Sequence, residues 1–372
     1  MIIRTLQSGT AKSCHGRLLP FYLFTFLLLS CSMIDEDQSD CGKDAKIDYE
    51  MRLITNMNIE LETQLDSVRD KDVIEALRNY LQNIFTDYAH DVDLSFYDTK
   101  TDSGRLHHEQ VIMNASQRSY TLYLPMREYM HLAVANDMNN QLVDLKDDEH
   151  CHPSKLQQTK ADTITPHTTG LFTARLPMDV KENEDQSFLV RLYMANCAAA
   201  LVIDTDGNDA TGMEVISTGF ASRFSICDSA FVFDDMPPVI KTDDVPVKGG
   251  LQKLFCTVNF PSKDTPPLTP SLRGTGDTRT VIETEEPFIA QSDEKSLWEL
   301  RVYVPRPGSA QSRSGVSITE TVLRLKKPLR AGQLMIIRGR LLPDGSVKPR
   351  SPEVGVSVTL DWKQGAIYHP EF

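Results

Sequence analysis

The sequence predicts a mainly β protein, built from antiparallel β-sandwiches with one helix. Short segments in which apolar and polar residues alternate recur along the chain, and turn signals such as Pro343-Asp344-Gly345 separate them. A single segment shows helical spacing instead. The length of 372 residues suits two domains.

The first half begins with a predicted strand at 47–59, where Met51, Leu53 and Thr55 fall on one face. Residues 70–86 form the predicted amphipathic helix, with Asp70 as its N-cap. Its apolar residues recur at helical spacing: Val73, Ile74, Leu77, Tyr80, Leu81, Ile84 and Phe85. Further strands are predicted at 92–96, 120–124, 130–134, 171–176 and 188–203.

In the second half of the sequence, apolar and polar residues alternate more regularly. Strands are predicted at 298–304, 316–318, 334–337 and 354–362, and 261–278 reads as an exposed loop rich in Pro, Thr, Ser and Gly. A charged stretch at 180–186 divides the chain most evenly. We therefore expect an N-terminal sandwich at 46–182, carrying the helix, and a C-terminal sandwich at 186–372.

Composition excludes some classes of function. The chain has 39 Lys and Arg against 52 Asp and Glu, a net charge of −13, so a partner with a phosphate backbone, such as nucleic acid, is not expected. Apolar residues make up 40%, enough for packed cores.

The N-terminus differs from the rest of the chain. Residues 1–30 hold Arg4, Lys12 and Arg17 but no acidic residue, and an apolar run covers 18–29. The run is too short to span a bilayer and suits a signal peptide. Its end, Leu28-Leu29-Ser30-Cys31, resembles the lipobox of bacterial lipoproteins, which implies cleavage before Cys31 and acylation of that residue. A plain secreted protein and an uncleaved apolar anchor are the alternatives.

Removal of this leader takes away three basic residues and no acidic ones, so the net charge of the remainder falls from −13 to −16. Residues 31–45 then form an acidic tether. Its Asp35, Glu36 and Asp37 resemble the signal that exports some outer-membrane lipoproteins to the cell surface, and a solvated linker is the alternative. We expect a surface-exposed protein that its lipid holds in the outer membrane.

No catalytic or cofactor motif is present in the sequence, so we expect a protein that is not an enzyme and has no cofactor. Residues 204–208 resemble a calcium loop only faintly, and a β-turn is expected there. A metal at His150-Cys151-His152 is conceivable but lacks a second ligand cluster, so a polar loop is favoured. His107-His108 is a weaker candidate still.

Five cysteines remain after Cys31: Cys41, Cys151, Cys197, Cys227 and Cys256. The exported compartment permits a disulfide, and the odd number leaves at least one thiol. The pairing is open at this stage. Cys197 lies in an apolar run and is expected to be a buried small hydrophobe.

Several segments together resemble the fimbrillin-associated anchor subunits of type V fimbriae, the FimB-like family. The start from Cys31 through the acidic stretch to Cys41 is similar to the opening of these proteins. So are Tyr120–Asn136, the run 188–203 as the strand that leads into the second domain, and the ending Val354–Gly365. The helix at 70–86 has no place in the family pattern.

The resemblance implies two transthyretin-like sandwiches and a lipoprotein that seats a fimbrial stalk on the outer membrane and terminates its growth at the base. Its partners would be shaft or accessory subunits, joined by strand complementation. The strands at 51–59 and 354–362 are the candidates for this exchange, and ordinary internal strands are the alternative for both. A glycan-binding surface lipoprotein is a second hypothesis, although Trp298 and Trp362 both fall on apolar faces.

Overall fold

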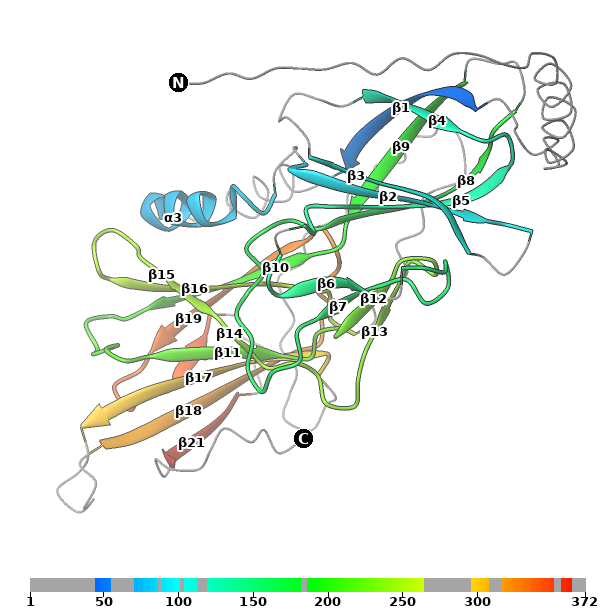
Figure 1. Cartoon of the computed structure of the whole chain (residues 1–372). Helices are drawn as coiled ribbons and strands as arrows, with labels where there is room; N and C mark the ends of the chain where they lie inside the picture. The colour runs from blue at the N-terminus through cyan, green and yellow to red at the C-terminus, as the bar shows by residue number, and fades with distance from the viewer. Residues whose placement is uncertain are drawn as a thin grey trace, which may run out of the picture. The chain divides into compact units, whose positions relative to one another are not determined.

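The computed structural model describes residues 44–54, 70–85, 89–100, 104–112, 119–138, 140–146, 148–181, 186–263, 296–307, 316–350 and 356–362 (Figure 1). Residues from Ala45 onward belong to one compact unit. The described part of this unit is built almost entirely of strands, which confirms the mainly β prediction.

A seven-stranded sheet contains most of the first-half strands, in the order β3-β2-β5-β8-β9-β1-β4. Neighbouring strands run antiparallel except β1 and β9, which are parallel. The bounds are β1 (Ala45–Ile54), β2 (Asp91–Asp98), β3 (Arg105–Ile112), β4 (Ser119–Leu124), β5 (Glu128–Ala135), β8 (Phe172–Asp179) and β9 (Gln186–Met194).

This sheet folds over on itself. Tyr49 of β1 meets His131 of β5 with ring centroids 5.4 Å apart, although β8 and β9 separate these two strands along the sheet. Figure 1 shows β1, β4 and β9 forming a layer over β2, β3 and β5. The two layers enclose a core that includes Ile47, Phe96 and Leu122. The curl thus makes a sandwich from one continuous sheet.

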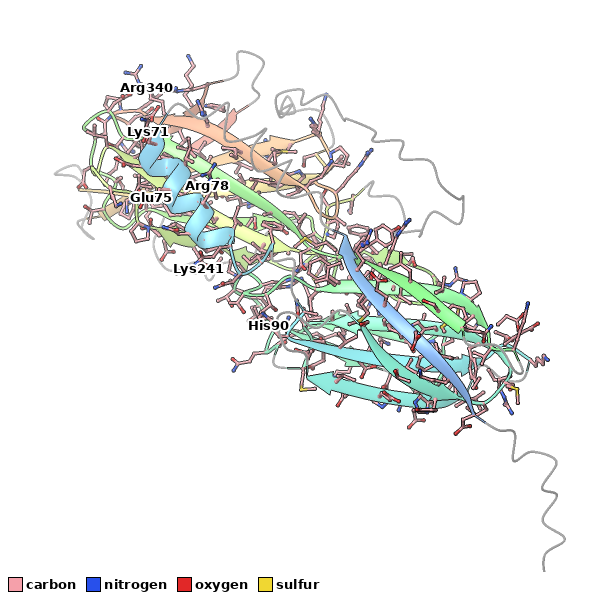
Figure 2. All side chains as sticks on the ribbon, turned by 90° about the horizontal axis from the view of Figure 1, so that it is seen from above. Lys71, Glu75, Arg78, His90, Lys241 and Arg340 are labelled. Carbon is pink, nitrogen blue, oxygen red and sulfur yellow. The ribbon has the colours of Figure 1, made fainter. Side chains whose placement is uncertain are left out.

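Helix α3 (Lys71–Leu81) forms within the predicted range 70–86 but ends at Leu81, because Ile84 and Phe85 lie in the turn that follows, where they are still buried. The Asp70 side chain accepts a hydrogen bond from the backbone N–H of Asp72, which caps the first turn. Val73, Leu77 and Leu81 are buried and face the sheet that contains β10, β15 and β16. The helix therefore comes from the first half of the sequence but covers a sheet formed by the second half, as Figure 2 shows from above.

That second-half sheet is five-stranded, in the order β15-β16-β10-β19-β20. A further five-stranded sheet, β14-β11-β17-β18-β21, packs on its other face through a core that includes Leu201, Trp298 and Ile337. Their bounds are β10 (Cys197–Asp204), β11 (Glu214–Thr218), β14 (Ile240–Lys241), β15 (Asp243–Val245), β16 (Gln252–Asn259), β17 (Trp298–Pro307), β18 (Val316–Leu325), β19 (Leu334–Leu341), β20 (Val347–Pro349) and β21 (Val356–Trp362). This pair of sheets is a second sandwich.

A four-stranded sheet, β13-β12-β7-β6, joins the two halves of the sequence. It combines β6 (Val143–Lys146) and β7 (Lys155–Gln158) with β12 (Arg223–Ser225) and β13 (Ala230–Val232). Leu156 and Phe224 pack with Leu132 of β5 in a third core. Strands from both sides of the predicted boundary at 182–186 thus share one sheet, and the two-domain division stays a prediction.

The predicted strand at 188–203 is two strands, which corrects the single run. β9 ends at Met194 and β10 begins at Cys197, so the chain passes between sheets at Asn196. The Asn196 amide is buried there: its Oδ1 accepts from the N–H of Leu171, and its Nδ2 lies 2.7 Å from Nδ1 of the buried His167. Periodicity alone does not reveal this break, because both strands are apolar.

Candidate functional site

The predicted lipidation and export residues, Cys31, Asp35, Glu36 and Asp37, lie outside the described residues, as does Cys41. Description begins at Asp44, and strand β1 begins at the next residue. The predicted tether therefore leads into β1 with no other described element in between. Among the described residues, no helix has the length and apolar character needed to cross a bilayer.

Strand β1 lies in the interior of the seven-stranded sheet. Residues Ala45–Glu50 pair antiparallel with β4, and Ile47–Ile54 pair parallel with β9. The central residues Ile47–Glu50 have a partner strand on both sides. A strand held in this way is not available to a partner unless it leaves the sheet.

The side chains of β1 alternate as the sequence predicts. Ile47, Tyr49 and Met51 are buried at 0%, 0% and 4% exposure. Charged residues point outward between them and form ion pairs along the strand, such as Lys46–Asp48 at 3.9 Å. Such exposed pairs add little to stability, so burial of the apolar face holds β1 in place.

A buried polar contact also fixes β1. The Nδ1 of His131 lies 3.1 Å from the carbonyl oxygen of Ser95, which can only accept, so Nδ1 carries the proton. Nε2 then accepts a hydrogen bond from the Tyr49 hydroxyl at 2.5 Å. Burial disfavours the charged imidazolium and lowers the pKa of His131 to about 4. The ring therefore stays neutral at neutral pH and keeps its acceptor for Tyr49.

Strand β21 has a different position. It pairs with β18 and is the last strand of its sheet among the described residues. The register of this pairing shifts between Ile318 and Glu320. Strand β21, within the predicted exchange strand at 354–362, thus lies at a sheet edge among the described residues, where backbone groups are open to another strand. Of the predicted exchange strand at 51–59, only Met51–Ile54 is described, and this end of β1 pairs with β9 but not with β4.

An acidic cavity of about 280 Å³ opens beside β2. Five aspartates contribute to its lining: Asp91, Asp93, Asp137, Asp144 and Asp148. Most have partners: Asp91 Oδ1 accepts from the N–H groups of Asp137 and Met138, and Asp93 contacts His108 at 2.6 Å. Burial raises the pKa of the Asp137 carboxyl to about 7. The side chains that line the cavity form a polar hydrogen-bonded network, and no catalytic arrangement occurs among them.

The segments considered above as possible metal sites have different surroundings in the structure. Residues 204–208 form a turn, with Asp206 and Gly207 at positive φ, as predicted. His107 contacts Glu109, and His150 forms a β-bridge with Gly104 beside the start of β3. His152 instead approaches Cys227 and Asp228, with possible ligand atoms within 4.8 Å of one another. Sequence reasoning missed Cys227 here, because 75 residues separate it from His152.

Trp298 belongs to the core, as predicted. It is 1% exposed, and its indole N–H donates to the carbonyl of Lys327 at 3.0 Å. A buried indole offers no platform for a sugar ring. The side chain of Trp362 lies outside the described residues.

No protein-family model and no curated protein matches the sequence. Solved structures resemble the fold. A candidate adhesin from Bacteroides ovatus has a TM-score of 0.47 and 12% identity, and the match covers 92% of this chain and 100% of the other. The fimbrial anchor protein Mfa2 from Porphyromonas gingivalis has a TM-score of 0.42, 10% identity and coverage of 86% and 99%.

The tip fimbrial protein Mfa3 from Porphyromonas gingivalis has a TM-score of 0.36, 13% identity and coverage of 86% and 100%. These three structures are those of a candidate adhesin and of two fimbrial proteins. Their scores lie below one half, so the function proposed next rests on the residues of this chain.

Proposed function

We propose that this chain is a lipid-anchored surface protein that seats a fimbrial stalk on the outer membrane and limits its length. Acyl chains on Cys31 hold the membrane end, and the acidic tether with Asp35, Glu36 and Asp37 spans the distance to β1. The lipobox-like sequence and the FimB-like opening support this proposal.

The observation that carries the proposal is the position of β1. Tension between the membrane and a stalk would pull on the N-terminal end of β1, along the strand. Its hydrogen bonds to β4 and β9 run across the strand, so the load falls on the whole ladder rather than on one bond at a time. An interior strand with a buried face suits an attachment that bears load.

The same position explains why the chain would act at the base. Loss of β1 would open the sheet between β4 and β9, but it would also separate the body from its lipid. A subunit anchored through β1 therefore keeps that strand in its own sheet and forms the end of the row of fimbrial subunits. Strand β21, at a sheet edge, is the place where we propose that a partner strand adds by β-augmentation.

The test is the Cys31→Ala variant in cells that make fimbriae, with Cys41→Ala as a matched control. The variant should leave the membrane fraction, and fimbriae should appear in the medium. The Cys41→Ala protein should stay in the membrane fraction with cell-attached fimbriae. Membrane retention of Cys31→Ala with attached fimbriae would refute the anchor function.

A further inference from the structure

Two cysteines meet at one end of the four-stranded sheet. Cys151 lies in the turn between β6 and β7, and Cys227 lies in the turn between β12 and β13. β7 and β12 pair antiparallel with Lys155 opposite Ser225, which brings the two turns together. The Sγ atoms are 2.7 Å apart, and both residues are buried, at 3% and 4% exposure.

This separation is too short for two thiols that merely touch. Non-bonded heavy atoms of this size rest at about 3.5 Å or more. A covalent S–S bond is the arrangement that brings two sulfur atoms inside that distance without repulsion. The two turns therefore hold the two sulfur atoms closer together than unbonded thiols would rest.

The other two described cysteines are excluded as partners. Cys197 lies in the core between the two five-stranded sheets, whereas Cys256 lies on the opposite face with α3. The strand register gives the same result. Cys256 pairs with Ala200, which is an odd number of residues from Cys197, so the two cysteines point to opposite faces of the sheet. Neither thiol can reach the other through the sheet.

We propose that Cys151 and Cys227 form a disulfide in the exported protein. The inference rests on the proposed function only in requiring export, where oxidation is possible. The oxidant is a thiol–disulfide oxidoreductase in its disulfide form. The thiolate of one of the two cysteines attacks one sulfur of that disulfide and expels a thiolate. The other cysteine then attacks the Sγ of the first and expels the second thiolate, and the two protons of the cysteines pass to the reduced oxidoreductase.

Both residues are buried in the folded chain, at 3% and 4% exposure, so an oxidoreductase cannot reach them there. The exchange therefore belongs to the stage of folding before the two turns close on each other.

The crosslink would tie together parts that are distant in sequence. The Cys151 turn also holds the start of β3, since Gly104 bridges to His150 and Arg105 pairs with Asp148. Cys227 lies 76 residues beyond Cys151. The disulfide would therefore secure the four-stranded sheet, which combines β6 and β7 from one side of the predicted boundary at 182–186 with β12 and β13 from the other.

Peptide mapping tests this inference. The full chain with its own leader is made in a bacterium that exports it, purified without reductant, denatured, and treated with iodoacetamide before digestion. A linked peptide pair with Cys151 and Cys227 is expected, with Cys197 and Cys256 alkylated as internal controls. Alkylation of both Cys151 and Cys227 in a chain with a processed leader overturns the disulfide, whether or not zinc is bound beside His152 and Asp228.

The same map separates this inference from the proposed function. An acylated Cys31 with free thiols at 151 and 227 leaves the anchor intact and overturns the disulfide. An unprocessed leader with free thiols overturns both. A linked pair on a chain with no acyl group supports the disulfide and counts against the anchor.

Thermal unfolding gives an independent readout. Reductant should lower the melting temperature of the parent chain by about 6 °C, because a long loop is no longer closed in the unfolded state. The double variant Cys151→Ala/Cys227→Ala should not respond to reductant, whereas Cys256→Ala should respond as the parent does. An equal response in the double variant would overturn the disulfide.

Discussion

The burial of His131, whose ring accepts a hydrogen bond from Tyr49 of β1, should make stability depend on pH in a way that one substitution removes. Folded His131 has a pKa lowered from 6.5 to about 4 by burial, so the folded state binds this proton less readily than the unfolded state. The contribution of His131 is fully present above pH 6.5. It is lost as the pH falls towards 4, because the unfolded chain takes up the proton first.

The magnitude follows from the two pKa values. When the pH falls from about 7.5 to about 5, His131 becomes protonated in the unfolded state but stays largely neutral in the folded state. This difference lowers the free energy of unfolding by about 2 kcal/mol. Other groups titrate in this range, and Asp137 acts in the opposite direction because burial raises its pKa to about 7. The measured quantity is therefore the difference between parent and variant, not the pH dependence of the parent alone.

The assay is urea unfolding of the parent and of His131→Gln at both pH values. Whatever its stability at each pH, the variant should lose about 2 kcal/mol less unfolding free energy than the parent between the two pH values. His90→Gln, at an exposed position, is the control and should behave as the parent. An unchanged pH dependence in His131→Gln would refute the buried neutral imidazole that accepts from Tyr49.

Three further predictions concern other positions. Tyr49→Phe removes the donor to His131 and should lower the free energy of unfolding in urea by about 1–3 kcal/mol at neutral pH. The control Tyr123→Phe, at a residue 58% exposed, should lower it by less than about 0.5 kcal/mol. Equal losses in the two variants would contradict the contact. Asp137→Asn should stabilise the protein by roughly 2 kcal/mol at about pH 8 and by less at about pH 5, because ionisation of the Asp137 carboxyl destabilises the folded state as the pH rises through its pKa of about 7. Destabilisation by Asp137→Asn at about pH 8 would count against this. Gly219→Ala should cost roughly 3 kcal/mol, since Gly219 has φ +100° and a Cβ would lie 2.7 Å from the carbonyl oxygen of Leu297; a melting temperature equal to that of the parent would contradict the clash.

Much of the fold follows from local pattern. The spacing of Val73, Leu77 and Leu81 predicts α3, and the alternation around Tyr49 predicts the buried face of β1. These signals are periodic and lie within one element, so a single sequence carries them.

Pairing between distant segments leaves no such local signal. Nothing in the sequence near Val73 says that the helix covers β10 and β16, and nothing near Phe224 says that β12 joins β7. The three-residue strands β12 and β13 are too short to show alternation. Strand β16, with Leu254 and Val258, shows no period-two alternation, because its apolar residues are consecutive and buried on both faces.

The candidate site divides in the same way. Cys31 and the acidic residues after it are predicted from a local sequence pattern, and they lie outside the described residues, so this prediction stays a prediction. The meeting of Cys151 with Cys227 depends on the β7–β12 pairing and could not be read from spacing. The interior position of β1 depends likewise on β4 and β9 from later in the chain.

The central claim, that this chain is the base of a fimbrial stalk, is tested most directly by its position along the fimbria. Immunogold electron microscopy of intact cells, with an antibody against the chain, gives that position. The account predicts label at the cell-surface end of fimbriae and none along the shaft. Label at the tip or along the shaft, or label unconnected with fimbriae, would contradict it.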